Sequence, residues 1–124
     1  MSEVIRVLLV DGNEAMREEL SQILDSEQGI VVVGEAPSGE AVLAEAKKLC
    51  PDVILMFTDS RMPGMTAIDA THAIGEARLP ARVIILTENL ARDLVPATKA
   101  GVAGLLSRNI SRDELLSAIC KIHR

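Results

Sequence analysis

Short runs of apolar residues alternate along the chain with longer segments in which apolar positions recur at the spacing of a helix. Five of the runs are nearly continuous in Val, Ile and Leu, as is typical of parallel strands that are buried on both faces. They cover Val4–Val10, Ile30–Ala36, Val53–Thr58, Arg82–Leu86 and Gly104–Leu106. The segments between them have the length of helices, roughly 10 to 13 residues, which indicates right-handed crossovers. The pattern predicts an α/β protein, a doubly wound five-stranded parallel sheet with five helices.

Polar residues at the expected helix starts sharpen the predicted boundaries. Thr66 with Asp69, and Ser111 with Glu114, have the spacing of a capping box, in which the two side chains satisfy backbone amides of the first turn. Pro96 suits the first turn of the fourth helix, where its missing amide proton would have no partner in any case. These signals predict where three of the five helices begin.

Composition narrows the class of protein. The 124 residues suit one domain, and the net charge is 13 − 18 = −5. An acidic chain with one aromatic residue offers neither clustered cations nor stacking rings, which argues against nucleic-acid binding by this domain itself. Its apolar runs are far shorter than the roughly 18 to 20 residues of a membrane span. Cys50 and Cys120 lie outside any paired-cysteine motif and suit a reducing compartment. We expect a cytoplasmic protein without membrane contact.

Polar residues follow four of the five predicted strands. They lie at residues 11–14, 58–65, 87–88 and 107–109. Because the carboxyl ends of parallel strands meet at one edge, and ligands of doubly wound sheets bind there, these residues are expected to line a single cleft. The first of these turns holds one glycine between acids, so it lacks the glycine-rich loop that cradles the phosphates of a nucleotide.

The residue types at this edge suggest phosphoryl transfer to an aspartate. Asp11 and Asp59 are carboxylates after the first and third strands, Thr87 is a hydroxyl after the fourth, and Arg108 is a cation after the fifth. A carboxylate nucleophile repels an incoming phosphoryl group unless Mg²⁺ on carboxylate oxygens screens the charge. A hydroxyl and a cation can then hold the bound phosphoryl group.

Several segments, in the right order, resemble the response-regulator receiver domain over nearly the whole chain. The matching segments are Val7–Asp11, Pro51–Met56, Asp59–Met65, Val83–Thr87 and Ala100–Arg108. The resemblance implies a flavodoxin-like sheet with strand order 2-1-3-4-5, a receiver (response regulatory) domain over residues 1–124, and a histidine kinase as partner. The helix Ser111–Ile122 resembles the NarL/FixJ-type subgroup. That likeness implies a C-terminal helix-turn-helix effector domain, absent from this chain, to which DNA binding would belong.

The chain departs from the family pattern where the chemistry would occur. Gly12 replaces the second acid of the first turn, which leaves Asp11 and Asp59 as weak candidates for Mg²⁺ ligands. Leu105 stands where the family has an aromatic switch residue, and Arg108 stands where it has lysine. A leucine cannot swing a ring, and a guanidinium is planar and longer than an ammonium group.

Counting along the third strand gives two candidates for the acceptor position. From Pro51 at the start of the strand, the family's acceptor falls on Phe57; from Pro63 in the following loop, it falls on Asp59. Two extra residues therefore lie between these anchors, a displacement of about 6 to 7 Å in an extended strand. Either a bulge draws Asp59 back into the pocket, or Phe57 fills the pocket and blocks it.

These departures lead to two hypotheses. The first is an atypical receiver of a transcription regulator, not an enzyme, that signals and dimerises independently of phosphorylation and needs no cofactor. Its partner would be a second copy or another protein, bound through residues 90–122, where charges such as Arg92 and Asp93 could pair across the interface. The alternative is a two-component receiver that uses Mg²⁺ to catalyse its own phosphorylation on Asp59.

Overall fold

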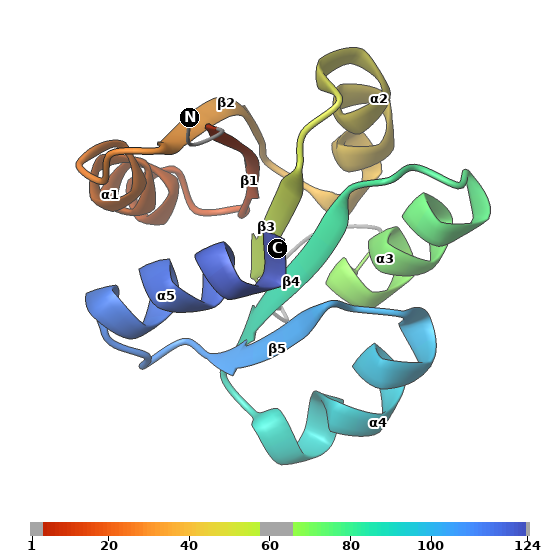
Figure 1. Ribbon diagram of the computed structural model, residues 1–124. Helices are drawn as coiled ribbons and strands as arrows, with labels where there is room; N and C mark the ends of the chain where they lie inside the picture. The colour runs from red at the N-terminus through yellow and green to blue at the C-terminus, as the bar shows by residue number, and fades with distance from the viewer. Residues whose placement is uncertain (1–3, 58–65, 124) are drawn as a thin grey trace.

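Residues 4–57 and 66–123 are described by the computed structural model, and they form five strands and five helices in strict alternation (Figure 1). The elements are β1 (Ile5–Val10), α1 (Glu14–Asp25), β2 (Ile30–Ala36), α2 (Gly39–Leu49), β3 (Val53–Phe57), α3 (Ala67–Glu76), β4 (Arg82–Thr87), α4 (Leu90–Ala100), β5 (Gly104–Ser107) and α5 (Arg112–His123). All strand pairs are parallel, and their order is β2-β1-β3-β4-β5. The predicted doubly wound, flavodoxin-like sheet of order 2-1-3-4-5 is confirmed.

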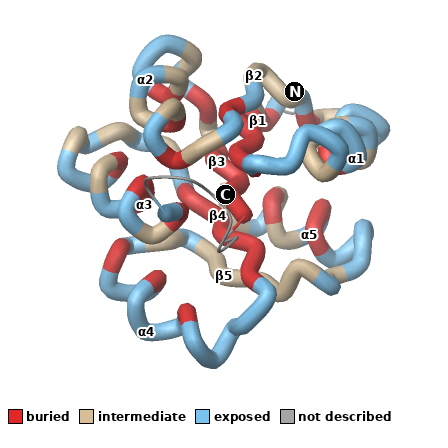
Figure 2. Tube along the Cα trace, turned by 180° about the vertical axis from the view of Figure 1, so that it is seen from behind, coloured by how far each residue is buried: buried red, intermediate tan, exposed pale blue. Residues whose placement is uncertain are grey.

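The core consists of two apolar layers, one on each face of the sheet. Alternate residues of a strand point to opposite faces, so β1 sends Val7 and Leu9 toward α1 and α5, and Leu8 and Val10 toward α2 and α3. All five residues of β3 are buried, because this strand lies in the middle of the sheet with helices over both faces. Figure 2 shows this buried centre, with exposed positions on the outer sides of the helices.

The helix starts agree with the predicted signals in two of three cases. Thr66 and Asp69 form the predicted capping box of α3. The Ser111 hydroxyl accepts the backbone N–H of Glu114 at 3.1 Å and donates to its carboxylate, so this pair also closes the start of α5. The prediction that Pro96 lies in the first turn of the fourth helix is wrong.

Pro96 lies well inside α4, which begins six residues earlier at Leu90. The cause is Asn89, whose side-chain oxygen accepts the backbone N–H of Arg92 and so caps the helix at 3.0 Å. Asparagine is a favoured capping residue because its side chain satisfies a backbone amide of the first turn. The cap at Asn89 therefore marks the start of α4, and Pro96 falls in the interior of the helix. Within the described residues, no helix combines the length and apolarity that crossing a membrane requires.

Candidate functional site

Asp11 lies at the carboxyl edge of the sheet, directly after β1, and only 1% of its surface is exposed. Its Oδ1 accepts the backbone N–H of Asn13 at 3.1 Å, and Asn13 caps α1. A Cβ built on the neighbouring Gly12 would meet only the Pro37 carbonyl oxygen, at an ordinary 3.5 Å. The turn therefore leaves room for a Cβ atom at Gly12, where the family pattern would place a second acid.

Phe57 is the last residue of β3, and its side chain belongs to the buried cluster between the sheet, α1 and α5. Its pairing with Leu86 continues the β3–β4 register from Val53↔Arg82 without a shift, so β3 has no bulge up to this residue. Phe57 therefore stands at the strand end where counting from Pro51 puts the family's acceptor. Asp59, the other candidate, lies outside the described residues.

The Arg108 side chain lies over the Phe57 ring. Its guanidinium carbon lies 4.6 Å from the centroid of the Phe57 ring, within the range of a cation–π contact. The same guanidinium donates to the Glu88 carboxylate at 3.0 Å, in an ion pair whose arginine is 14% exposed and whose glutamate is 60% exposed. The cation predicted for the cleft is thus held by an aromatic ring and an acid of this chain.

Thr87 ends β4 and is fully buried. Its hydroxyl donates to the carboxylate of Asp93 and accepts the backbone N–H of Asn89 at 3.0 Å. Asp93 is only 6% exposed, and the Arg92 side chain donates to both of its oxygens, at 3.0 and 3.1 Å. Thr87, the hydroxyl predicted to hold a phosphoryl group, is therefore bonded to a buried acid in the first turn of α4.

Asp93 is a site residue that sequence reasoning placed elsewhere. Its carboxylate does not offer a charge to another chain, since it is buried and bonded within its own. The hydrogen bond to Asp93, followed by the charge of Asp93, raises the pKa of the Arg92 guanidinium. Because arginine is charged in both the folded and the unfolded protein at any pH below its ordinary pKa, the raised pKa of Arg92 adds no pH dependence of stability near neutrality.

Leu105 lies in β5, where it pairs with Ile85 and packs against the apolar layer on the α2 and α3 face. It is partly buried and occupies a packing position. The described residues contain no group of three or more His, Cys, Asp or Glu side chains that could hold a metal ion. Of the two predicted Mg²⁺ ligands only Asp11 lies within the described residues, and one carboxylate is fewer than the several oxygen ligands that Mg²⁺ takes.

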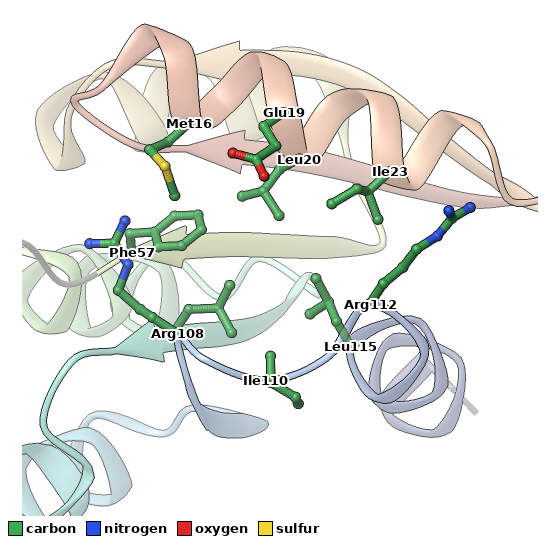
Figure 3. A pocket seen from close by; sticks show the side chains of 10 residues that line it. Met16, Glu19, Leu20, Ile23, Phe57, Arg108, Ile110, Arg112 and Leu115 are labelled. Carbon is green, nitrogen blue, oxygen red and sulfur yellow. The ribbon is translucent and has the colours of Figure 1, made fainter.

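A cavity of about 140 Å³ opens beside this edge, between α1 and α5. Figure 3 shows Phe57 and Arg108 at one end of it and Arg112 at the other, with α1 above. The sequence gives no sign of this cavity, because tertiary packing brings its lining together from α1, β3, β4, the loop after β5 and α5. The altered edge of the sheet is therefore continuous with a partly apolar pocket.

The family model described as the response regulator receiver domain matches residues 7–120. The chain belongs to this family. It is 36% identical over 121 residues to the response regulator UvrY of Escherichia coli K12, covering 97% of this chain and 55% of that protein. It is 33% identical over 118 residues to the nitrate/nitrite response regulator NarL of the same organism, covering 94% and 54%. The chain thus spans about half the length of the curated relatives it matches.

Solved structures agree with the assignment to the receiver domain family. The signal receiver domain of NarL from Mycobacterium tuberculosis superposes with a TM-score of 0.90 at 31% identity, covering 98% of this chain and 97% of that one. The response regulator domain of Thermotoga maritima CheB gives 0.89 at 32% identity, with the same coverage. The predicted NarL/FixJ-type receiver domain is confirmed, and the chain is a signalling module of the two-component kind.

Proposed function

We propose that this domain is an atypical receiver that signals through protein contacts independently of phosphorylation. The observation that supports the proposal is Phe57, buried at the end of β3, where counting from Pro51 puts the family's acceptor carboxylate. A phenyl ring has no nucleophilic atom and offers no oxygen to Mg²⁺. With this ring at the strand end, the site is closed to aspartyl phosphorylation.

The other groups of the site support the same proposal, because each is already engaged within the chain. Arg108 stacks on Phe57 and pairs with Glu88, and the Thr87 hydroxyl donates to Asp93. To bind a phosphoryl group, Arg108 and Thr87 would have to leave these partners. The buried hydrogen bond from Thr87 to Asp93 resists such exchange, since a hydrogen bond to a charged group stabilises by about 1.5 to 3 kcal/mol, whereas the Arg108–Glu88 pair is weak because Glu88 is exposed.

Beryllofluoride, a mimic of the phosphoryl group, tests this proposal. We expect two-dimensional NMR spectra of the domain with Mg²⁺ to be unchanged when beryllofluoride is added, because the last described residue of β3 is Phe57, which offers no carboxylate, and the Thr87 hydroxyl is bonded to Asp93. A conventional receiver in parallel serves as the positive control. Saturable shifts at Thr87 and Arg108 would support the alternative function, an Mg²⁺-dependent receiver phosphorylated on Asp59.

The output surface in this proposal is the face formed by residues 90–122, and its partner is a second copy of the chain. Leu90 and Leu94 lie one turn apart on α4 and are 44% and 55% exposed, and Val95 beside them is 58% exposed. Exposed apolar side chains grouped on one helix are typical of an interaction site. The homodimer would bury them against the same face of the partner, because a two-fold interface uses the same surface patch of both copies.

Sedimentation equilibrium checks the dimer. We expect the weight-average mass to rise with concentration, and Leu94→Asp to hold the domain monomeric, because a charge at the centre of an apolar contact is costly to bury. The matched control is Val4→Asp, which puts the same charge on a residue 53% exposed before β1. Equal association of both variants would show that α4 is not the interface.

The roles of the whole protein follow from this arrangement. A C-terminal helix-turn-helix domain beyond residues 1–124 would bind DNA, and the receiver would set the spacing of two such domains by dimerising. Neither a cofactor nor a histidine kinase is needed for this output, which would take place in the cytoplasm. Under the alternative function, a histidine kinase would instead supply the phosphoryl group.

A further inference from the structure

The cavity between α1 and α5 has the features of a small-ligand site. Ligand pockets are concave and mostly apolar, with a few polar groups that fix orientation. The wall on α1 consists of Met16, Leu20 and Ile23, the floor of Phe57 and Leu86, and the opposite wall of Leu115 on α5. Of these side chains, Leu20, Phe57, Leu86 and Leu115 are buried, which gives the cavity a fixed floor and sides.

The size of the cavity limits the ligand. Its volume is about 140 Å³. An engineered cavity of about 150 Å³ lined by Leu, Ile and Phe stays dry and takes up benzene. The apolar part of a ligand here would therefore have the size of a single ring or of a short branched chain.

The charges around the cavity select the sign of the ligand. Arg108 and Arg112 line its two ends and Glu19 lies between them on α1, so the lining carries a net charge of 2 − 1 = +1 (Figure 3). The Arg112 side chain is exposed and donates to the Ser26 hydroxyl. Arg108 is the more enclosed cation, with its guanidinium fixed over Phe57. An anionic group is favoured at the Arg108 end.

The Glu88 carboxylate pairs with Arg108, and the carboxylate of a ligand could replace it. Its side chain is 60% exposed, so the Glu88 carboxylate returns to water at little cost when the pair opens. Ion pairs with one solvent-exposed partner are weak, and a planar guanidinium can instead take a second carboxylate in a two-point contact. Arg108 can therefore exchange the Glu88 carboxylate for that of a ligand.

We propose that this cavity binds a small organic carboxylate, with its apolar body between α1 and α5 and its carboxylate paired with Arg108. The ligand would bridge Phe57, at the end of β3, and α5, which belongs to the proposed output face. The ligand would then act as the signal in place of a phosphoryl group. This signalling role rests on the proposed function. Binding itself requires only the cavity and Arg108.

Benzoate is the probe that tests this proposal, with benzyl alcohol as its neutral counterpart. In two-dimensional NMR titrations we expect saturable benzoate shifts at residues lining the cavity, in the millimolar range that suits so small a ligand. Arg108→Gln should weaken benzoate about tenfold and leave benzyl alcohol unchanged, since only the charged contact is lost. Glu88→Gln should strengthen benzoate a few-fold, because Arg108 no longer has a competing acid.

Arg78→Gln, a matched change at an exposed arginine after α3, should leave both titrations unaltered. Absence of saturable shifts, shifts confined to another surface, or equal benzoate affinity in Arg108→Gln and the parent would overturn the proposal. Because benzyl alcohol reports on the apolar cavity, a variant that merely unfolds loses both ligands and is recognised. Phosphorylation by acetyl phosphate would contradict the proposed function while leaving benzoate binding intact, so the two failures are distinguishable.

Discussion

Replacing Phe57 with alanine is expected to lower the free energy of unfolding by about 3 to 5 kcal/mol, the usual cost of removing a large aromatic side chain from a core. The ring is 2% exposed and packs in the layer that joins the sheet to α1 and α5. The variant loses the transfer free energy of the ring, the contacts it made, and the cation–π contact with Arg108. The size of this loss reflects a ring that is part of the core.

Urea denaturation of Phe57→Ala and its parent measures this loss directly. The matched control is Val4→Ala, at a residue 53% exposed before β1, where truncation is expected to change stability by no more than about 0.5 kcal/mol. A cost below about 1 kcal/mol for Phe57→Ala would mean that the ring is not packed at the strand end. That result would remove the main support for the proposed function.

The second large effect is expected at Asp93. Changing it to alanine leaves the buried Thr87 hydroxyl without the carboxylate to which it donates, a loss of about 1 to 3 kcal/mol for an unsatisfied buried polar group. Arg92 adds little to this figure, since its side chain is 58% exposed and water replaces the lost partner. The expected loss of stability therefore comes mainly from the hydrogen bond between Thr87 on β4 and Asp93 at the start of α4.

A double-mutant cycle separates this contact from general damage to α4. We expect Asp93→Ala to be markedly less costly in a Thr87→Val background, with a coupling energy of about 1 to 2 kcal/mol, because the hydroxyl that needs an acceptor is gone. Asp93→Asn keeps an acceptor oxygen and should be milder than alanine. Purely additive effects of Thr87→Val and Asp93→Ala would show that the two side chains do not act together.

The fold could be predicted from the sequence because its main determinants are local and periodic. Strands buried on both faces require nearly continuous apolar runs, and helices on the sheet require apolar positions at helical spacing. The boundary of α4 could not be placed correctly, since Pro96 is tolerated inside the helix once Asn89 has capped its start. Two competing local signals existed, and the capping hydrogen bond determined the boundary.

The site was predictable in outline but not in its contacts. Motif order places Asp11, Thr87 and Arg108 at one edge of the sheet, and the structure brings them to that edge. Counting could not choose between Phe57 and Asp59, because anchors on the two sides disagreed by two residues. The β3–β4 register fixes where Phe57 lies, and register is a property of strand pairing that no count along one strand contains.

Asp93 shows a second limit of reasoning from one sequence. A charged residue in the first turn of a helix usually faces water, and burial of this one depends on the position of Thr87, six residues earlier on another element. The cavity between α1 and α5 is similar, since its lining comes from four elements. Such features arise from tertiary packing, so they carry no local pattern.

Intact-mass spectrometry after incubation with acetyl phosphate and Mg²⁺ shows whether this domain can be phosphorylated. We expect that it gains no phosphoryl group while a conventional receiver in the same experiment is modified, because the buried Phe57 ends β3 where counting from Pro51 puts the acceptor. One labile, Mg²⁺-dependent phosphoryl group on the parent that is absent from Asp59→Asn would contradict it. That result would establish Asp59 as the acceptor and the chain as a phosphorylated two-component receiver.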